Sequence, residues 1–436
     1  VTAATGSNSN NHFYANTCQN SNVGIALTGF ADTTPFANAD ARNDIGGASL
    51  ATGNIVKNFG GGAATNPAAG IRCTAQYGVN ISYNTVNNND GAGVNHATTL
   101  RGIFNNTAVS ASATITNNTV TVKSGATTSL LTAIDNVAGA TAAGNTISIN
   151  NNTIQNCTYS TATSGAFTGI VNSASAANVN INNNVLAGNA TNATSGATNL
   201  IQNTGAVTVA LNINGNNING WTFNAVTSGT LNGINSTNTV TAALSISNNN
   251  FQAITHAVAG SSTHLYITYT NASSNTANIN GNTFTNLNVN TTGSVTFMTR
   301  AGNMTATGVE NCNNNSIVTA FNKGGAGGTV SFYGANASSV NGSSMTQTGN
   351  NFSNVTVTGA TTIAGWSNTD GASSSSGPVK SITSNTFNNI TGGTSAVTGM
   401  SVNFSGANST VAQNTISNIN SGAAITPIIF RRLNPA

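Results

Sequence analysis

The sequence predicts an all-β fold, a solenoid of parallel strands in which each coil is one sequence repeat. Three observations support this prediction. A short motif recurs about every 33 residues along most of the chain. Apolar and polar residues alternate before each copy of the motif, as in a strand with one buried face. Only 10 basic and 7 acidic side chains occur among 436 residues, whereas 78 are Asn and 47 are Gly.

The recurring motif is an apolar residue, two small or polar residues, Asn, any residue and a second apolar residue. It reads ISYNTV at 81–86, INNNTI at 149–154 and INGNTF at 279–284. Gly53 takes the place of the Asn in the second copy. The motif Asn residues are Asn16, Asn84, Asn118, Asn152, Asn184, Asn216, Asn249, Asn282, Asn315, Asn350, Asn385 and Asn414. Together with Gly53 they predict about 13 coils.

Each repeat begins with a strand, because segments such as LNIN at 211–214 and LSIS at 244–247 alternate with period two. An Asn-rich turn follows, since Asn tolerates left-handed backbone and hydrogen-bonds its own main chain. A second strand is expected around segments such as TGIV at 168–171 and NGIN at 232–235. Loops of variable length, rich in Ser, Thr, Gly and Ala, connect these strands and account for the drift in the period.

Stacked coils place equivalent Asn residues about 4.8 Å apart, so their amides can form a hydrogen-bonded ladder. Thirteen such coils would make a rod about 60 Å long. Helical repeats are disfavoured, because they need helix formers and a charged solvent face. We expect a single solenoid domain at 1–420. The apolar and basic segment 421–436 should be a tail that caps the last coil or contacts another subunit.

The alternating strands, Asn-rich turns and repeat length resemble the right-handed parallel β-helix of the pectate-lyase-like superfamily. The Asn, Thr, Ser, Gly and Ala bias is similar to that of secreted bacterial surface and adhesin repeat proteins, including those of Bacteroidota. The resemblance covers residues 13 to about 420. It implies the fold and its handedness, whereas the function stays open because this fold carries lyases, hydrolases, adhesins and inert rods.

The candidate catalytic residues are Asp90, His96 and Arg101, which lie within one repeat. A carboxylate, an imidazole and a guanidinium could form an acid–base site. The alternative is a polar loop in which Arg101 pairs with Asp135 of the next coil, because both lie 17 residues after their motif Asn. No two carboxylates are brought by the repeat within the 5–10 Å that glycosidases need. Asp40, Arg42 and Asp44 are interpreted as a charged loop, with a calcium site as a weaker alternative.

No metal or cofactor site is expected, since the remaining histidines (His12, His256 and His264) lack metal-binding spacing. The Gly-rich segments 60–64 and 324–328 lack the ending of a phosphate-binding loop, and both are interpreted as flexible loops. The cysteines are mainly core residues. Only Cys18 and Cys73, one coil apart, could form a disulfide.

The sequence favours a secreted structural solenoid at the cell surface, forming a fibre, adhesin stalk or matrix. Its partners would be further copies of itself, stacked head to tail, or other surface proteins, with glycans as a further possibility. One alternative is a polysaccharide-binding protein, lyase or hydrolase. Another is ice binding by polar outward pairs such as Thr114/Thr116. A net charge of +3 argues against nucleic acid as a partner, and no apolar run is long enough to span a membrane.

Overall fold

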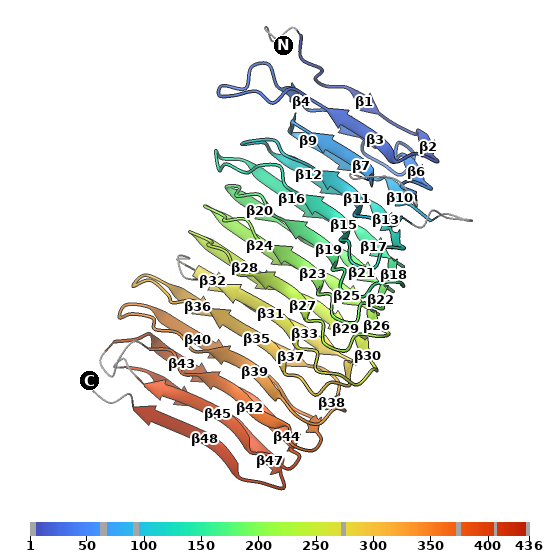
Figure 1. The fold of residues 1–436 in the computed structure, drawn as a ribbon. Helices are drawn as coiled ribbons and strands as arrows, with labels where there is room; N and C mark the ends of the chain where they lie inside the picture. Colours follow the sequence, from blue (N-terminus) through green and yellow to red (C-terminus); the bar gives the residue numbers. More distant parts are fainter. Residues whose placement is uncertain are drawn as a thin grey trace. The chain divides into compact units, whose positions relative to one another are not determined.

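The computed structural model describes residues 6–61, 68–89, 96–271, 276–371, 376–404 and 408–432. These residues form a parallel β-solenoid of about 12 turns and contain no α-helix. The predicted fold class is therefore confirmed. The chain divides into two compact units, Val1–Thr208 and Val209–Ala436, and each unit is built from the same kind of coil. A complete coil carries up to four strands, which we number as sheets 1 to 4 in chain order (Figure 1).

The strands of the first unit pair in parallel with the equivalent strand of the next coil. Sheet 1 holds β1 (His12–Phe13), β5 (Asp44–Ile45), β9 (Val79–Ser82), β12 (Ala113–Thr116), β16 (Thr146–Asn150) and β20 (Asn178–Asn180). Sheet 2 holds β2 (Thr17–Gln19), β6 (Ile55–Lys57), β10 (Thr85–Asn87), β13 (Thr119–Thr121), β17 (Thr153–Gln155) and β21 (Val185–Ala187). Sheet 3 holds β14 (Lys123–Ser124), β18 (Thr158–Tyr159) and β22 (Ala190–Thr191). Sheet 4 holds β3 (Val23–Thr28), β7 (Ala68–Thr74), β11 (Leu100–Asn105), β15 (Leu131–Asn136), β19 (Phe167–Asn172) and β23 (Thr198–Asn203), and a separate pair joins β4 (Asp40–Ala41) to β8 (Gln76–Tyr77).

The second unit repeats this arrangement. Sheet 1 holds β24 (Ala210–Asn214), β28 (Ala243–Ser247), β32 (Thr276–Asn278), β36 (Val309–Asn311), β40 (Ser344–Thr348), β43 (Val379–Thr383) and β46 (Thr410–Ala412). Sheet 2 holds β25 (Asn217–Asn219), β29 (Asn250–Gln252), β33 (Thr283–Thr285) and β37 (Ser316–Ile317). Sheet 3 holds β26 (Thr222–Phe223), β30 (Thr255–His256), β34 (Asn288–Val289), β38 (Phe321–Lys323), β41 (Val355–Val357), β44 (Thr386–Thr391) and β47 (Thr415–Asn420). Sheet 4 holds β27 (Leu231–Ser236), β31 (His264–Thr270), β35 (Val295–Ala301), β39 (Thr329–Ala335), β42 (Thr362–Asn368), β45 (Val397–Phe404) and β48 (Ile425–Arg432).

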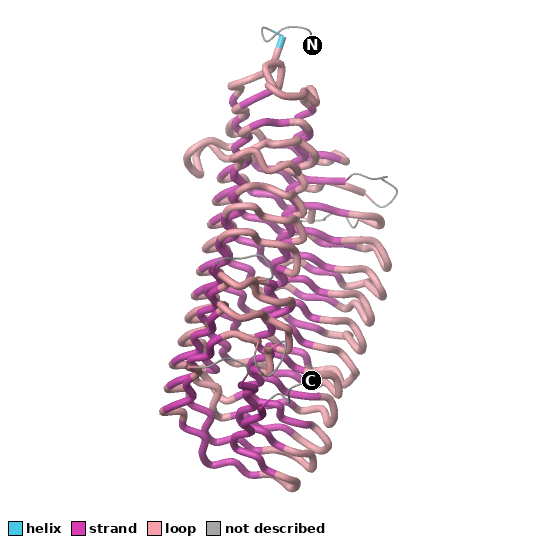
Figure 2. The backbone as a smooth tube through the Cα atoms, turned by 90° about the vertical axis from the view of Figure 1, so that its left-hand side faces the viewer, coloured by secondary structure: helices cyan, strands magenta, loops and turns pink. Residues whose placement is uncertain are grey.

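Sheet 1 shows the alternation that the sequence predicted. In β16 the two Ile side chains are buried, whereas the Thr, Ser and Asn residues around them are partly exposed. Ile81, Ile115 and Ile149 are register partners on successive coils, so the buried side chains form a continuous apolar row. Figure 2 shows how the strands of each unit stack coil upon coil, with loops at the corners.

The predicted Asn ladder is present at the turn between sheets 1 and 2. Asn118 is typical of its members: its Nδ2 donates to Asn152 Oδ1 at 3.0 Å and to the main-chain oxygen of Ile81 at 2.8 Å. Its Oδ1 in turn accepts the main-chain N–H and the Nδ2–H of Asn84. Both donors and the acceptor of a buried amide are thus satisfied without any charge.

One member of the ladder was assigned wrongly from the sequence. Asn54, and not Gly53, occupies the position in the second coil, where it accepts from Asn16 and donates to Asn84. A Cβ at Gly53 would lie 2.0 Å from the main-chain oxygen of Tyr83, so this place admits only glycine. In the second coil the ladder residue is therefore one position later than the motif predicts, and the side-chain amide of Asn54 still reaches Asn16 and Asn84.

A second ladder, which the sequence analysis did not identify, runs along the end of sheet 4 in the first unit. Asn105, Asn136 and Asn172 each donate through Nδ2 to the Oδ1 of the next member, over 2.7–2.8 Å. The last acceptor is Asn203, whose own Nδ2 donates to the main-chain oxygen of Gly205. Each of these residues ends a strand and follows a buried Ile by two positions, as in IDN at 134–136. That spacing is a sequence signal, but one more Asn in an Asn-rich chain is easily overlooked.

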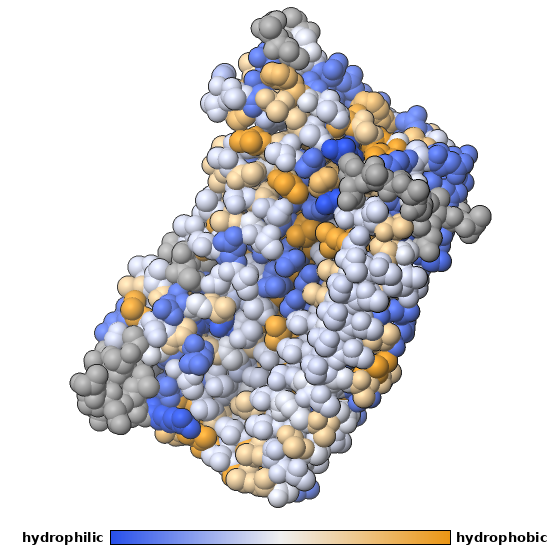
Figure 3. Space-filling view, in the orientation of Figure 1, coloured by the Kyte–Doolittle hydropathy of each residue, from blue (hydrophilic) through white to orange (hydrophobic). Residues whose placement is uncertain are grey.

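Aromatic side chains fill the core of the second unit. Phe251, Phe284, Phe297, Phe332 and Phe352 are buried, with neighbouring ring centroids 4.9–6.4 Å apart. On the face drawn in Figure 3, most atoms have intermediate hydropathy, and the strongly polar and apolar residues are interspersed. The unit therefore concentrates its large apolar side chains inside, which is where their burial stabilises the fold.

The boundary expected at residue 420 does not coincide with the end of the sheets. Residues 425–432 form β48, which pairs with β45 in register from Ile425 to Arg432. Half of the segment expected to be a tail, eight of its sixteen residues, is thus the last described strand of sheet 4. Its sequence, ITPIIFRR, favours the extended conformation of a strand, because it is rich in β-branched and aromatic residues.

Candidate functional site

The candidate catalytic residues of the first unit are only partly placed by the structure. Asp90 lies outside the described residues. His96 is buried, with Nδ1 2.8 Å from the main-chain oxygen of Gly61 and Nε2 2.8 Å from Thr98 Oγ1. The three-residue acid–base site therefore stays a prediction, and both nitrogens of His96 already have partners within the fold.

Arg101 makes the ion pair that the sequence offered as the alternative. Its Nε lies 2.6 Å from Asp135 Oδ2, and its guanidinium carbon lies 4.2 Å from the centre of the Phe104 ring. Burial raises the pKa of Asp135 above its ordinary value, although the hydrogen bond from Arg101 acts in the opposite direction. The pair lies on sheet 4 and links two consecutive coils.

The acidic residues near the beginning of the first unit hold loops together. Asp44 accepts from Tyr14 Oη and from Asn80 Nδ2, each at 2.6 Å. Asp40 accepts the main-chain N–H of Asn8, and Asp32 accepts that of Asn38. Among the described residues, no three His, Cys, Asp or Glu side chains lie close enough to hold a metal ion.

The largest group of charged residues, missed in the sequence analysis, is buried in the second unit. Arg300 Nε lies 2.9 Å from Glu310 Oε2, and Arg300 Nη2 contacts Asp370 Oδ2. All three side chains are fully buried. Burial alone would lower the pKa of Arg300, but the neighbouring carboxylates raise it above its usual value. We name Arg300, Glu310, Asp370 and Lys380 the buried ionic cluster.

Lys380 completes this cluster through the main chain. Its Nζ donates to the main-chain oxygens of Asp370 and Asn403, both at 2.7 Å, and to that of Asn368 at 3.1 Å. Burial lowers its pKa to about 8, while Asp370 acts in the opposite direction. The four charges cancel, and the residues come from separate coils. No sequence signal could have found them, because charges this far apart show no common spacing.

Lys323 is held in a similar way by a Gly-rich segment. Its Nζ donates to the main-chain oxygens of Thr291 and Gly325 at 2.6 Å and of Gly327 at 2.7 Å. Segment 324–328 is a loop, as expected from the sequence, and glycine there lets main-chain oxygens approach the ammonium group. The expected flexibility of this loop stays a prediction. Residues 62–67 are outside the described residues, so most of the other Gly-rich segment stays untested.

His256 and His264 form a buried pair in the second unit. His256 Nε2 lies 2.8 Å from the main-chain oxygen of Val226, and its Nδ1 lies 2.9 Å from His264 Nε2. The carbonyl requires a proton on His256 Nε2, so His256 Nδ1 accepts and His264 Nε2 donates. His264 Nδ1 then has no partner among the described residues. Burial lowers the pKa of His264 to about 3, with smaller contributions from His256 and Lys323.

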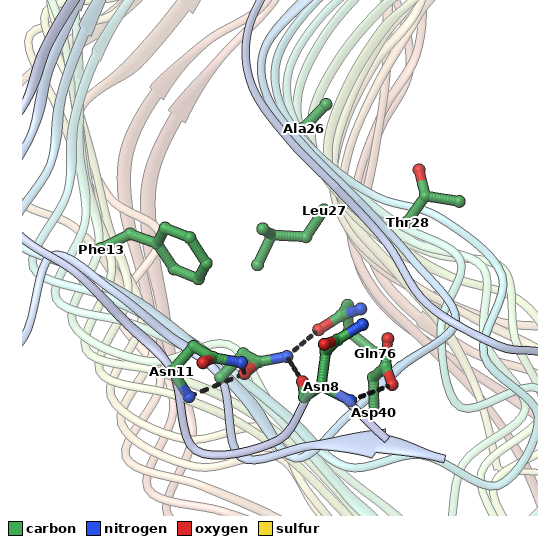
Figure 4. Close-up of a pocket in the computed structure, with 9 residues that line it drawn as sticks. Asn8, Asn11, Phe13, Ala26, Leu27, Thr28, Asp40 and Gln76 are labelled. Carbon is green, nitrogen blue, oxygen red and sulfur yellow. Dashed lines mark hydrogen bonds between the residues drawn. The ribbon is translucent and has the colours of Figure 1, made fainter. Parts of the chain in front are cut away.

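The first described coil is hollowed by a cavity of about 390 Å³ (Figure 4). Its lining is apolar on one side, with Phe13 and Leu27, and polar on the other, with Asp40, Asn43 and Gln76. A second cavity of about 410 Å³ shares Phe13 and Leu27. Phe13, Leu27 and Cys18 are only half-buried, although the same places on the coils above them are filled and buried.

The last described coil also exposes apolar side chains. Ile425, Ile428 and Phe430 on β48 are 40%, 37% and 55% exposed, whereas their register partners Val397, Met400 and Val402 on β45 are fully buried. This surface of the second unit and the first described coil of the first unit are each a candidate contact site, since each presents core-type residues to solvent.

The remaining sequence candidates do not add a further site. All four cysteines are free, and Cys18 and Cys73 lie on β2 and β7, in different sheets, so the disulfide allowed by the sequence is not formed. Trp221 and Trp366 are fully buried and offer no ring to a sugar. Outward pairs such as Thr114/Thr116 lie on sheet 1, and their expected role in ice binding stays a prediction.

No protein-family model matches the chain, and no curated protein matches it significantly. The described residues form no helix of the length and apolarity needed to cross a lipid bilayer.

Proposed function

We propose that this chain is a structural β-solenoid of an extracellular fibre, adhesin stalk or matrix, and that copies stack head to tail. One observation carries the proposal: the first and last described coils present complementary halves of the same Asn ladder. In each complete step the amide and the main-chain N–H of one Asn donate to Oδ1 of the Asn in the next coil, as from Asn282 to Asn315.

The polarity of the ladder defines what each end coil offers. Asn16, in the first coil, is exposed, and its Oδ1 receives no donor from the described residues. Asn414, in the last coil, accepts from Asn385 and donates to Ile382, which leaves its main-chain N–H and one Nδ2–H without an acceptor in the described chain. The N–H donors of Asn414 in one copy are thus complementary to Oδ1 of Asn16 in the next copy. Contact between two identical ends would instead bring donors against donors, or acceptors against acceptors.

Apolar contacts would accompany this step of the ladder. The exposed Ile428 and Phe430 would cover Ile25 and Leu27 of the next copy, which occupy equivalent places on β3. Covering a side chain of this size contributes about 1.5–3 kcal/mol. The main-chain groups at the free edges of the sheets would also gain partners. Contacts of this kind do not close on themselves, and they build filaments.

The extracellular location and the bacterial origin belong to the same proposal. A fibre exposed to changing surroundings benefits from a surface with few ionisable groups, because few charges on that surface then change with pH. Of the charged side chains in the second unit, Arg300, Glu310, Lys323, Asp370 and Lys380 are buried and have partners. The scarcity of charge at the surface is one feature that this chain shares with the β-helical surface proteins that its sequence resembles, and the proposed location is drawn by analogy with them.

The test is the assembly state of the purified chain and of two variants. We expect filaments or a concentration-dependent series of oligomers in electron microscopy and sedimentation. Phe430→Asp would place a charge in the end contact and should prevent assembly. Val318→Asp is the matched control, because Val318 is 56% exposed but lies on the side of a coil. Monomers at all concentrations, or equal effects of both variants, would refute end-to-end stacking.

A further inference from the structure

The chain contains five Asn–Gly pairs, and all of them lie in the second unit. An Asn followed by Gly can react with its own main chain, because glycine has no side chain to hinder attack by its nitrogen on the Asn side-chain carbon. The pairs are Asn214–Gly215, Asn219–Gly220, Asn232–Gly233, Asn280–Gly281 and Asn341–Gly342. The five pairs differ in whether the glycine nitrogen is hydrogen-bonded within the fold.

Three of the glycine nitrogens are held by hydrogen bonds of the solenoid. The amides of Gly215, Gly220 and Gly281 donate to main-chain oxygens of the following coil at 2.9, 3.0 and 2.9 Å. Gly233 lies within β27, between residues paired with β31. To attack the Asn side-chain carbon, a glycine nitrogen must lose its proton, and it must therefore first give up the hydrogen bond that this proton makes. Each of these bonds therefore opposes the reaction.

Gly342 is different. It lies with Asn341 in an exposed turn before β40, and no acceptor for its amide is found among the described residues. Its φ of +90° is a backbone conformation that glycine adopts without strain. The turn is closed beside it, where Ser343 Oγ donates to the main-chain oxygen of Val340 at 2.6 Å. The attacking nitrogen is therefore accessible and unprotected.

The other reactant is polarised by a neighbouring coil. Asn341 Oδ1 accepts the main-chain N–H of Gly377 at 3.0 Å. A donor at this oxygen stabilises the negative charge that develops there when a nucleophile adds to the carbonyl carbon. We infer that Asn341 is a site of spontaneous deamidation in the folded protein, and that the other four Asn–Gly pairs are protected by the fold.

The reaction needs only water. The Gly342 nitrogen gives its proton to hydroxide or water and bonds to the Asn341 side-chain carbon. The bond from that carbon to Nδ2 breaks, and the nitrogen takes up a proton and leaves as ammonia. Water then opens the resulting succinimide to Asp or isoaspartate. The sum is one asparagine and one water giving one carboxylic acid and ammonia.

This product would change the surface of the second unit. The carboxylates among its described residues are those of Glu310 and Asp370, and both are fully buried. Deamidation of Asn341 would thus place a carboxylate on a surface whose described residues expose none. The isoaspartate form would also lengthen the main chain by one carbon in the turn that leads into β40.

The experiment compares the folded and the urea-unfolded full-length protein during incubation at mildly alkaline pH. Peptide mapping that separates Asn, Asp and isoaspartate follows all five pairs. In the folded protein we expect conversion at Asn341 at least about tenfold faster than at Asn214, Asn219 or Asn280. In urea the rates should converge. A rate at Asn341 equal to or below that of the three others in the folded protein would overturn the inference.

Two variants provide an independent readout by ion exchange. Asn341→Gln lengthens the side chain by one methylene and disfavours ring closure, so the acidic species that accumulates on incubation should disappear. Asn280→Gln is the matched control and should leave that species unchanged. Its persistence in Asn341→Gln would contradict the assignment.

Discussion

Arg101 and Asp135 form an ion pair across two coils although they are not register partners. Arg101 is opposite Thr132, and Asp135 is opposite Phe104, yet Arg101 Nε lies 2.6 Å from Asp135 Oδ2. The side chain of Arg101 crosses diagonally over the Phe104 ring to reach it. Equal distances from the motif Asn suggested this pair, but the loops before the two strands differ in length, so the guanidinium has to span the offset.

Removing this guanidinium should affect stability and the titration of its partner. In Arg101→Ala we expect a loss of about 1–2 kcal/mol at neutral pH, since Asp135 keeps a largely buried carboxylate without a charge partner. The pKa of Asp135 should rise further above its ordinary value. Urea unfolding and NMR titration of the carboxyl group would measure both effects. Arg101→Lys should restore part of each, and an unchanged titration would argue against the pair.

The Asn ladder should be sensitive to the loss of a single member. Asn282→Ala removes the acceptor of Asn249 and the donors to Asn315 and Ile246, which leaves several buried polar groups without partners. We expect a loss of about 3 kcal/mol or more in urea unfolding of the second unit. Asn322→Ala is the control, because Asn322 is an exposed residue of the neighbouring β38 and should cost little. Equal losses would show that the ladder is energetically unimportant.

Acid should destabilise the second unit through its buried histidines. His264 has a pKa of about 3 in the folded protein and an ordinary value of 6.5, so below pH 6.5 the unfolded chain binds more protons. Stability is therefore complete above this pH and falls progressively toward pH 3. Each pKa unit corresponds to about 1.4 kcal/mol. Thermal unfolding between pH 7 and 4 would follow this loss.

The double variant His256→Phe/His264→Phe should flatten that pH dependence between pH 6.5 and 4. His12, whose side chain is 62% exposed, provides the control, because His12→Phe removes a histidine at the surface. A profile equally steep in the double variant and in the parent would exclude the buried pair as the acid-sensitive element.

The buried ionic cluster should tolerate no loss of its central cation. Arg300→Met would leave Glu310 and Asp370 as buried carboxylates without their partner, at a cost of about 3–5 kcal/mol at neutral pH. Arg431→Met, at an exposed position of β48, should have little effect on urea unfolding. Equal stability of both variants would contradict a structural role for the cluster.

The fold was predictable because its signals are local and repeated. Alternating residues before each motif specify a strand with one buried face, and the recurring Asn gives the register in which successive coils pair. Asn118 and Asn282, for example, have the partners that the sequence predicted. Even the error at Gly53 was a displacement of one residue, since the neighbouring Asn54 completes the ladder.

The sites were less predictable, because they depend on loops and on side-chain reach. Arg300 and Asp370 are 70 residues apart, and the register partner of Arg300 in the next coil is Ala335. That small side chain leaves room for the guanidinium to pass to the coil beyond. No residue spacing in the sequence predicts a contact of this kind.

The sequence by itself therefore determined the coil, the parallel pairing of its strands and the main amide ladder of this protein. Only the tertiary structure decided which charged residues are buried and which amides are protected. The reason is physical: a periodic pattern acts between neighbouring coils through the main chain, whereas ion pairs and free amides depend on individual loop lengths and side-chain volumes.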